Sequence, residues 1–566
     1  MDGKGDGVVK LSSEISCDVL VVGSGLAGCM AALEASRVCP RVIVASAGPI
    51  LSGSSFFEGT WGLGCIAAKD REDDANLVQS ILDVGCGMAD EELAGTLVRE
   101  TRPLLYDLEK RGILLRKPDA AAEREYIPCF DRAHRMWRGL EHESLRRVLT
   151  RALDRKSITL LPHHLLIDII EDAQGRVGEA SGIPSQVIGA VLFDTSSSSF
   201  LAVSARSVVL ATGGMGGLFG AHLVGGDCLG SAQAIALAHG EKLVNIEFLQ
   251  LMPTVMTPKG PVVFNEKCFR FSDLSIPADD ALLDQRSTYG PFTSRLASRE
   301  VDLRIARAEM PVFVRVDRLP HPAPEFIETY RSWYEASTGL RIEDPVELRH
   351  FAHASNGGIA IKRDTSCALP GLFAAGECTG GMHGADRIGG LASANALVFG
   401  RNAGHYAAIR ALGEYDIPVE VDAALEKAPD AETIGAELGA ILDEHALVIR
   451  TDEGLAQAER SLAGLSLRLD RTEPGNQGEA ALTLLQRQRV LSACALVSAM
   501  RARTESRGAH YRADHPAEDP AQVRPTPSRS ERTAQSPSSL PSIRKVVEWT
   551  IGPSINNEEV PHALVT

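Results

Sequence analysis

The sequence lacks any uninterrupted apolar run of the roughly 18–20 residues that a membrane-spanning helix requires. Its first residues also lack the basic segment and following apolar segment that are typical of a signal peptide. We therefore expect a cytoplasmic protein with no membrane span.

An excess of positive charge is absent as well. The 58 Lys and Arg residues are outnumbered by 74 Asp and Glu residues, so the formal net charge is −16 at pH 7. A protein whose main partner is nucleic acid needs a basic surface that neutralises phosphates. We predict no nucleic-acid partner, whereas a local cationic pocket for a small anion remains compatible with this charge.

The cysteines show none of the spacings that mark a metal centre. The chain has 11 cysteines, an odd number, and none of them form a CxxC pair. This pattern argues against a disulfide framework, a zinc site or an iron–sulfur cluster. We predict reduced thiols and no metal, so any redox chemistry would have to come from another cofactor.

What the sequence does contain is a succession of different patterns, and its 566 residues are enough for three or four domains. Residues 74–155 have a mostly helical pattern, and residues 158–210 are strand-like with a turn at 196–199. Residues 423–503 have the periodicity of packed helices, and residues 518–542 have the Pro- and Ser-rich composition of a loosely held linker. We predict an α/β protein with four parts: a discontinuous Rossmann-like nucleotide-binding domain (1–242 and 345–412), an inserted α+β capping domain that acts as a substrate lid (243–344), a C-terminal helical domain (413–516), and a Pro/Ser-rich linker and tail (517–566).

A glycine-rich loop stands where a dinucleotide-binding fold needs it. Gly23-Ser24-Gly25-Leu26-Ala27-Gly28 follows the apolar run 18–22 and precedes a helical pattern, and a second apolar run covers 42–45. Glycines allow the tight turn, and the helix amino terminus offers its N–H groups to phosphates. The second run ends without the carboxylate that usually binds a ribose, and Ser46 is the candidate substitute.

Beyond this loop, the segment from Ser46 to Phe57 resembles the flavoproteins of the L-aspartate oxidase, fumarate reductase and succinate dehydrogenase family. It is most similar there to the L-aspartate oxidases, which also have a serine at the position of Ser46. Further motifs follow in the family's order: Ala211-Thr212-Gly213-Gly214, the segment from Glu247 to Thr254, the segment from Leu296 to Val301, His353, Gly376-Glu377, the segment from His383 to Arg387, and the segment from Glu505 to His510. The resemblance covers nearly the whole chain except its end.

The resemblance implies a Rossmann-like FAD-binding domain. Succinate dehydrogenases of the membrane attach their flavin to a histidine, but no histidine lies between Val42 and Ala68, so we expect non-covalent FAD. Glu377 matches the residue that contacts the ribityl chain, and Asp227 lies in the loop on the adenine side. The positions implied to bind FAD are Gly23, Ser24, Gly25, Ala27, Gly28, Ser46, Ser54, Ser55, Gly64, Ala211, Thr212, Gly213, Asp227, Glu377 and Arg387.

The resemblance also implies a site for a small dicarboxylate or amino acid. Arg387 and His353 correspond to residues that bind substrate carboxylates, in keeping with the bidentate donors of a guanidinium. Arg299 corresponds to the acid/base residue, and Glu266 to its proton-relay partner. Because the pKa of an arginine exceeds about 12, such a role needs a water-excluded site under the capping domain.

Three departures from the family's motifs concern substrate selection. Met252, in the substrate-binding motif that ends at Thr254, stands where the family has a histidine, and a methionine carries no charge. Cys129 falls where aspartate oxidases place a carboxylate near the substrate amino group, with Asp131 as the alternative. Leu391-Ala392 replaces the family's Asn-Ser.

These observations leave three functions open. The first is an L-aspartate oxidase-like enzyme, in which a hydride moves from aspartate to flavin N5, giving iminoaspartate for NAD biosynthesis, and electrons pass to oxygen or fumarate. The alternative is a fumarate reductase-type reductase of an unsaturated (di)carboxylic acid, which needs an unidentified redox partner. The third is a FAD-binding subunit without catalysis.

Overall fold

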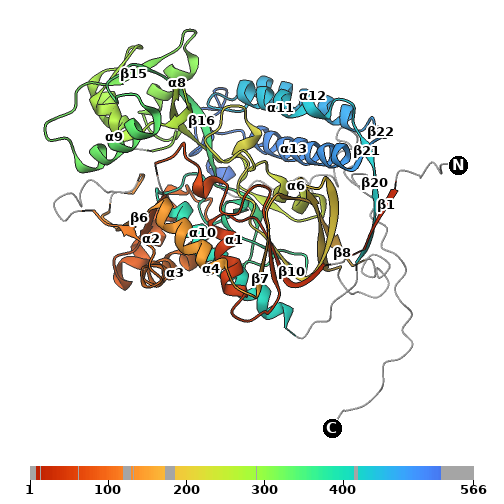
Figure 1. Ribbon diagram of the computed structural model, residues 1–566. Coiled ribbons are helices and arrows are strands. Elements are labelled where there is room, and N and C mark those ends of the chain that lie inside the picture. Colours follow the sequence, from red (N-terminus) through yellow and green to blue (C-terminus); the bar gives the residue numbers. More distant parts are fainter. Residues whose placement is uncertain are drawn as a thin grey trace, which may run out of the picture.

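The computed structural model describes residues 8–12, 15–61, 63–118, 129–131, 133–172, 185–288, 290–412 and 419–523. Its centre is a seven-stranded sheet that the amino-terminal half of the chain builds almost alone (Figure 1). The strands, in spatial order, are β7 (Ile158–Leu161), β3 (Val42–Ala45), β2 (Ile15–Val22), β10 (Ser199–Leu210), β9 (Val187–Asp194) and β8 (His164–Glu171), with β18 (Leu372–Ala374) also paired to β10.

The predicted strand–loop–helix–strand unit is confirmed. β2 and β3 are parallel neighbours, with Val22 paired to Ala45, and helix α1 (Leu26–Ala35) connects them. The predicted hairpin turn is also confirmed, because β9 and β10 are antiparallel and Asp194 pairs with Ser199. The helical pattern of residues 74–155 corresponds to α2 (Arg71–Val84), α3 (Glu91–Lys110) and α4 (His142–Leu153).

Smaller sheets join the central sheet to the rest of the chain. Their strands are β4 (Leu63–Ala67), β6 (Met136–Leu140) and β5 (Leu115–Arg116); β11 (Leu243–Val244), β17 (Gly358–Ala360) and β19 (Thr379–Gly380); β1 (Val8–Ser12) with β20 (Glu420–Ala424); and β21 (Glu426–Lys427) with β22 (Glu473–Pro474). Strand β4 of the first of these sheets contributes Leu63 and Gly64 to the cavity described below.

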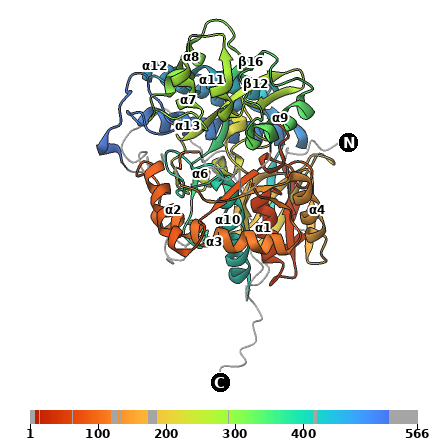
Figure 2. The same cartoon turned by 90° about the vertical axis from the view of Figure 1, so that its left-hand side faces the viewer.

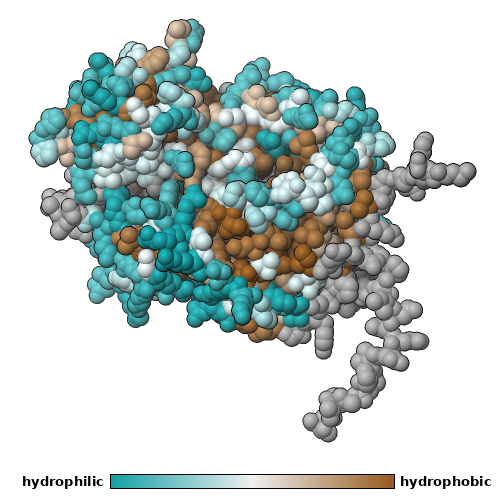
Figure 3. Space-filling model, viewed as in Figure 1, coloured by the Kyte–Doolittle hydropathy of each residue, from teal (hydrophilic) through white to brown (hydrophobic). Residues whose placement is uncertain are grey.

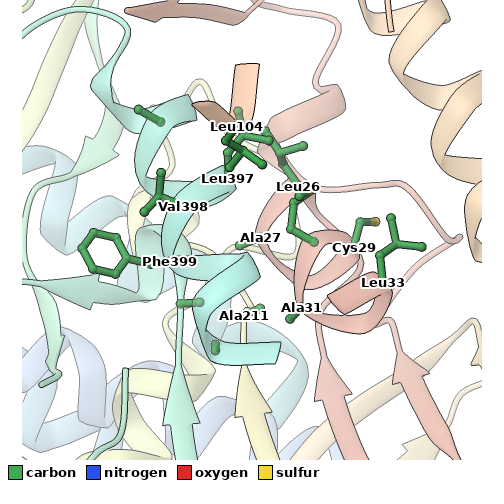
Figure 4. Close-up of a cluster of buried hydrophobic side chains, with 14 of the residues drawn as sticks. Leu26, Ala27, Cys29, Ala31, Leu33, Leu104, Ala211, Leu397, Val398 and Phe399 are labelled. Carbon is green, nitrogen blue, oxygen red and sulfur yellow. The ribbon is translucent and has the colours of Figure 1, made fainter. Parts of the chain in front are cut away.

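Helix α10 (Leu391–Ala411) packs against α1 with almost no space between the two backbones (Figure 4). A Cβ atom added at Gly400 would lie 2.4 Å from the Ala27 oxygen, and one added at Gly404 would lie 2.1 Å from the Ala31 oxygen. Both distances are far below van der Waals contact, so the two glycines are what allow α10 to lie this close to the helix that follows the glycine-rich loop.

We expect Gly404→Ala to lower the free energy of unfolding by about 1–3 kcal/mol, because the new methyl group must push α10 away from α1. The matched control is Gly464→Ala on α12 (Asp452–Leu469), where an added Cβ meets nothing within 4 Å. There the substitution should stabilise slightly, by about 0.4–1 kcal/mol. Urea denaturation of both variants measures the difference, and equal effects at the two positions would contradict the close helix contact.

The chain between β11 and β17 forms a second body, which lies above the central sheet (Figures 1 and 2). Its five-stranded sheet has the order β13 (Gly260–Val263), β12 (Leu249–Thr257), β16 (Val346–Ser355), β15 (Phe313–Val316) and β14 (Ser272–Leu274). Helices α7 (Asp280–Arg286), α8 (Arg299–Arg307) and α9 (Glu325–Thr338) complete it. Its own apolar cluster includes Phe269, Val314 and Tyr330, so this part of the chain forms a packed cap.

The C-terminal helices predicted from the pattern of residues 423–503 are confirmed. They are α11 (Ala431–His445), α12 and α13 (Gln477–Ala502), and they pack beside the cap and over the short helix α6 (Ser231–Ala238) (Figure 1). The chain after α13 is held by hydrogen bonds as far as Gln522, whose backbone oxygen accepts from Arg503 at 3.1 Å. The first residues of the segment expected to be loosely held are thus ordered, and those after 523 lie outside the described residues.

Hydrophilic side chains cover most of the face shown in Figure 3, over the cap and over α2 to α4, in line with the acidic composition. Apolar side chains gather near its middle, between α1 and β8. Among the helices that the structure describes, none has both the length and the apolar character needed to cross a bilayer.

Candidate active site

Four parallel strands end at the same edge of the central sheet, and the loops that follow them enclose a cavity of about 350 Å³. The pairing aligns Val22 with Ala45 and Leu210, and Leu210 with Ala374. Each next residue (Gly23, Ser46, Ala211 and Ala375) lines the cavity. A crevice outside the carboxyl ends of parallel strands is where α/β sheets bind nucleotides.

The glycine-rich loop is shaped by close backbone contacts. Gly23 has φ +111°, and an added Cβ would lie 2.2 Å from the Ala211 oxygen, so only glycine fits there. Gly28 does not line the cavity but packs under the loop, where an added Cβ would lie 1.8 Å from the Gly23 oxygen. The first N–H groups of α1 follow this loop, and Leu26 donates to the Ser55 hydroxyl at 3.1 Å.

The cavity wall fits a large polar ligand such as FAD. Of the residues expected to bind FAD, all but Gly28 line the cavity. Two polar atoms on this wall, Thr212 Oγ1 and Asn395 Oδ1, are buried and have no hydrogen-bond partner within the described part of the chain. Buried polar atoms in native proteins are normally paired, so these two are available to a bound ligand. The amino-terminal residues of α10 line the same wall, which places a helix N-terminus there.

Glu377 and Asp227 are the two carboxylates on the cavity wall among the residues that the structure describes. Glu377 follows β18 and accepts a hydrogen bond from the Ser355 N–H at 2.9 Å, and it packs directly against Gly214. Burial raises the pKa of both carboxyl groups. Ser46 lies at the end of β3 as expected, but its hydroxyl already donates to the Pro49 oxygen at 3.2 Å and accepts from Ser24 at 2.8 Å.

At the other end of the cavity lies Arg387, the one Lys or Arg among the described residues that line it. Its Nε donates to Gln250 Oε1 at 3.0 Å, and Nη1 donates to the Ile388 oxygen at 3.3 Å. These two hydrogen bonds hold the guanidinium in place at the cavity wall. Burial lowers the pKa of Arg387, and Glu377 opposes this effect. A fixed guanidinium of this kind suits a carboxylate ligand.

His353 and His383 line the same end. Burial and the nearby Arg387 charge lower the pKa of His353 to about 4 and hold the pKa of His383 well below its usual range. Both rings are therefore neutral at pH 7. Their Nδ1 atoms are buried and have no partner among the described residues, so each is available to a ligand.

Met252 lies on β12 with an apolar wall around it. It forms a buried cluster with Leu223, Val263 and Phe351, and the first three of these four residues also line the cavity. Thr254, expected beside the substrate, is buried and does not line the cavity, and its hydroxyl donates to the Met252 oxygen at 3.1 Å.

Arg299 is the first residue of α8 and is not on the cavity wall in this structure. Its guanidinium donates to the Ser294 oxygen and lies 6.0 Å from the centroid of the Tyr511 ring. The segment before it is nevertheless tied to the site. Thr293 and Arg295 both donate to Asp386, at 2.7 and 3.0 Å, and Asp386 directly precedes Arg387.

Glu266 contacts Cys129 rather than Arg299. The Cys129 thiol donates to Glu266 Oε1 at 3.1 Å, and burial, reinforced by Glu266, raises the pKa of this thiol well above its usual range. Among the described hydrogen bonds and ion pairs, none joins Arg299 to Glu266, so the proton relay stays a prediction. Asp131, the alternative to Cys129, is buried in an ion pair with Arg135 at 2.7 Å.

Sequence reasoning missed part of this wall. Ser393 and Asn395 come from the start of α10, and Leu485 reaches the cavity from α13. The small residues at 389, 390 and 392–394 were the signal for the first two, since small residues at a helix start allow close approach of a ligand. No sequence signal pointed to Leu485, because its place depends on how the C-terminal helices pack.

Comparison with known proteins agrees with this geometry. Residues 18–271 and 297–392, more than half of the chain, match the family model described as FAD binding domain, and residues 435–537 match that of the fumarate reductase flavoprotein C-terminus. The fold and the cavity thus define a FAD-dependent oxidoreductase, and the protein is an enzyme that uses FAD.

Individual relatives and a solved structure identify the family more closely. The chain is 29% identical to one of the subunits of the fumarate reductase (CoM/CoB) of Methanothermobacter marburgensis, over 89% of this chain and 96% of the relative. It is 28% identical to the L-aspartate oxidase of Caulobacter vibrioides, over 89% of this chain and 94% of the relative. The apo Sdh1 complex of Mycobacterium smegmatis contains a chain of the same fold, with a TM-score of 0.73, 24% identity and 90% of each chain covered. The protein belongs to the L-aspartate oxidase, fumarate reductase and succinate dehydrogenase flavoprotein family.

Proposed function

We propose that the protein is a reductase that adds a hydride and a proton to the carbon–carbon double bond of an unsaturated carboxylic acid. The observation that carries this choice over aspartate oxidation is Cys129. Where aspartate oxidases are expected to hold a carboxylate for the amino group, this chain has a neutral thiol that donates to Glu266. Residue 129 itself would offer an ammonium group no counter-charge, whereas an unsaturated acid needs none; neither Cys129 nor its partner Glu266 lines the cavity in this structure.

FAD, held by the residues along the strand ends, supplies a two-electron centre that exchanges a hydride with a substrate carbon. Arg387 binds the substrate carboxylate, and its bonds to Gln250 and Ile388 set the orientation. The neutral rings of His353 and His383 offer further hydrogen bonds. In this proposal the cap keeps water from the substrate, and a side chain of the protein supplies the proton.

Arg299 is the residue we assign to proton delivery. It reaches the site by leaving the Ser294 oxygen, while Thr293 and Arg295 keep its segment attached to Asp386. A positioned acid contributes about 10²–10⁴-fold to the rate, so Arg299→Ala should lower kcat by that factor and change substrate affinity little. The matched control is Arg304→Ala on the same helix, whose side chain is 40% exposed.

The test is anaerobic oxidation of a reduced viologen dye by fumarate and other unsaturated acids, with the FAD-loaded protein as catalyst. Wild type and Arg304→Ala should turn over at similar rates, and Arg299→Ala should be nearly inactive. Full activity of Arg299→Ala would remove that residue from the mechanism, and inactivity of the wild type with every acid would refute the reductase proposal.

The second candidate is L-aspartate oxidation, which the segment from Ser46 to Phe57 favours. In that case the oxidised, FAD-loaded protein should lose its visible flavin absorbance when L-aspartate is added without oxygen. In aspartate oxidation, oxygen, fumarate or a redox protein would accept the electrons. The reductase instead needs a redox partner that donates them.

A further inference from the structure

The part of the cavity around Arg387, His353 and Met252, which we call the substrate end, offers one positive charge and an apolar wall. Arg387 is the single Lys or Arg among the described lining residues, and the two histidines beside it are neutral at pH 7. A dicarboxylate would bring a second negative charge into this end. Arg299, the further cation that the proposed mechanism brings there, is engaged in delivering the proton, and Met252 offers a second carboxylate neither a charge nor a strong hydrogen bond. Burying a carboxylate without a partner of its own costs several kcal/mol, so the site as built suits one carboxylate better than two.

The apolar wall is continuous and well buried. Met252, Leu223 and Val263 are 8%, 1% and 6% exposed, and all three line the cavity. Phe57, Trp61 and Trp333 pack against this cluster from outside. A ligand group that rests on such a wall gains from being apolar, at roughly 25 cal/mol per Å² of apolar surface removed from water.

A second cavity of about 350 Å³ adjoins the first at Trp61, Leu63 and Gly64, which line both. It lies between the cap and the sheet of β4 and β6, and its wall includes Trp137, Phe326 and Trp333. Polar side chains line it as well, namely Arg116, Glu141, His142 and Glu143, so the rings form one side of a mixed wall. Three of the chain's four tryptophans therefore meet in one place.

The aromatic rings of this second cavity are held in fixed positions. Trp61 meets Phe326 edge to face, with 4.9 Å between the ring centroids. The guanidinium of Arg116 lies 5.0 Å from the Trp137 ring and 5.5 Å from the Trp61 ring, and it is 3.5 Å from Glu141. An aromatic or branched group that extends from the first cavity would contact these rings on one side.

We infer that the substrate is a monocarboxylic acid with an apolar, preferably aromatic, group on the β-carbon, bound with its carboxylate on Arg387 and its apolar group along Met252 toward Trp61. This assignment rests on the proposed function, because it names the substrate class of that same reductase site. It differs from the dicarboxylate that the family resemblance led us to expect.

Atoms and electrons balance in the reduction of such an acid. A hydride from the reduced flavin is added to the β-carbon of R–CH=CH–COO⁻, and a proton is added to the α-carbon, giving R–CH₂–CH₂–COO⁻. The double bond is reduced by two electrons and the flavin is oxidised by the same two. An external one-electron donor, the reduced viologen of the assay, restores the reduced flavin in two steps.

The test compares 3-phenylpropenoate with fumarate in the viologen assay with the FAD-loaded protein. We expect kcat/KM to be at least about tenfold higher for 3-phenylpropenoate, which corresponds to about 1.4 kcal/mol. Met252→His should reverse the preference by about tenfold or more, because it places a polar ring where the second carboxylate would lie. Met252→Gln serves if the histidine variant does not fold, and Met310→His, at a 76% exposed surface position, is the matched control.

A binding measurement separates the failure of this inference from the failure of the proposed function. Calorimetry of the FAD-loaded protein should show 3-phenylpropanoate, the saturated product, binding at least about tenfold more tightly than succinate. If fumarate is the better substrate and succinate the tighter ligand, the reductase proposal stands and the inference is wrong. If no acid is reduced, the proposed function fails, and the calorimetric order alone supports or overturns the apolar substrate class.

Discussion

Replacement of Arg387 by methionine lowers kcat/KM for the acid substrate by about two to four orders of magnitude. Arg387 is the single guanidinium on the cavity wall within the described residues, and its pairing with a buried substrate carboxylate would be lost. Leaving one partner of a buried ion pair alone costs about 3–5 kcal/mol, and each 1.4 kcal/mol is a factor of ten. Methionine fills similar space, so the effect reports the charge and not a cavity.

FAD binding and turnover of each Arg387 variant are measured separately. Arg387→Met should still bind FAD, as judged by flavin fluorescence quenching, because most of the wall comes from the strand-end loops and α10. Arg387→Lys should recover only part of the activity, since an ammonium cannot make the bidentate bond. Arg349→Met, at an exposed position on the strand that carries His353, should behave like wild type. Equal kcat/KM in Arg387→Met and Arg349→Met would contradict the assigned role.

The second large effect concerns stability. Arg503→Met should lower the local free energy of unfolding around the end of α13 by about 3–5 kcal/mol, because it removes the buried cation that pairs with Glu247, while Glu505 still accepts from Arg507 at 2.8 Å. Arg503 donates to Glu247 and to Glu505, each at 2.7 Å, and all three side chains are at most 2% exposed. Glu247 lies just before β12, so this ion-pair cluster joins the cap to the C-terminal helices.

Native-state hydrogen exchange measures this effect where it occurs. Amides at the end of α13 and near β12 should lose protection in Arg503→Met, while amides of β2 and β3 should keep theirs. The matched control is Arg501→Met, two residues earlier. Arg501 is 38% exposed and pairs with Asp452 and Glu459 at the surface, so its loss should cost less than about 1 kcal/mol. A similar loss of protection in both variants would contradict the prediction that the buried ion pairs stabilise this region more than the exposed ones do.

Local sequence patterns predicted much of the fold. The glycine-rich loop with its flanking strands and helix, the hairpin turn at 196–199, and the helical character of residues 423–503 were all visible in the sequence. These features depend on residues close together in the chain, where hydrophobic periodicity and turn-forming residues act directly. Among the strand-end loops, the glycine-rich loop followed from the same reasoning, whereas the positions after β10 and β18 were implied by the family resemblance.

What the sequence could not supply depends on residues far apart in the chain. Cys129 and Glu266 are 137 positions apart, and their contact required the cap to be in place. The same holds for the aromatic cavity, where Trp61 and Trp137 meet Phe326 and Trp333 from α9. The departure at Met252 was visible in the sequence. Only the packed structure shows that the neighbours of Met252 are apolar and that Arg387 is the cation among the described residues of the cavity wall.

The most direct test of the proposed chemistry is a single turnover. The FAD-loaded protein is reduced photochemically without oxygen and mixed with one equivalent of an unsaturated acid, and the visible flavin absorbance is followed. We predict full return of the oxidised flavin spectrum in wild type, with one equivalent of saturated acid formed, and a return slowed by about two to four orders of magnitude in Arg387→Met. A flavin that stays reduced with every acid, or an Arg387→Met variant that is reoxidised as fast as wild type, would contradict the proposed chemistry.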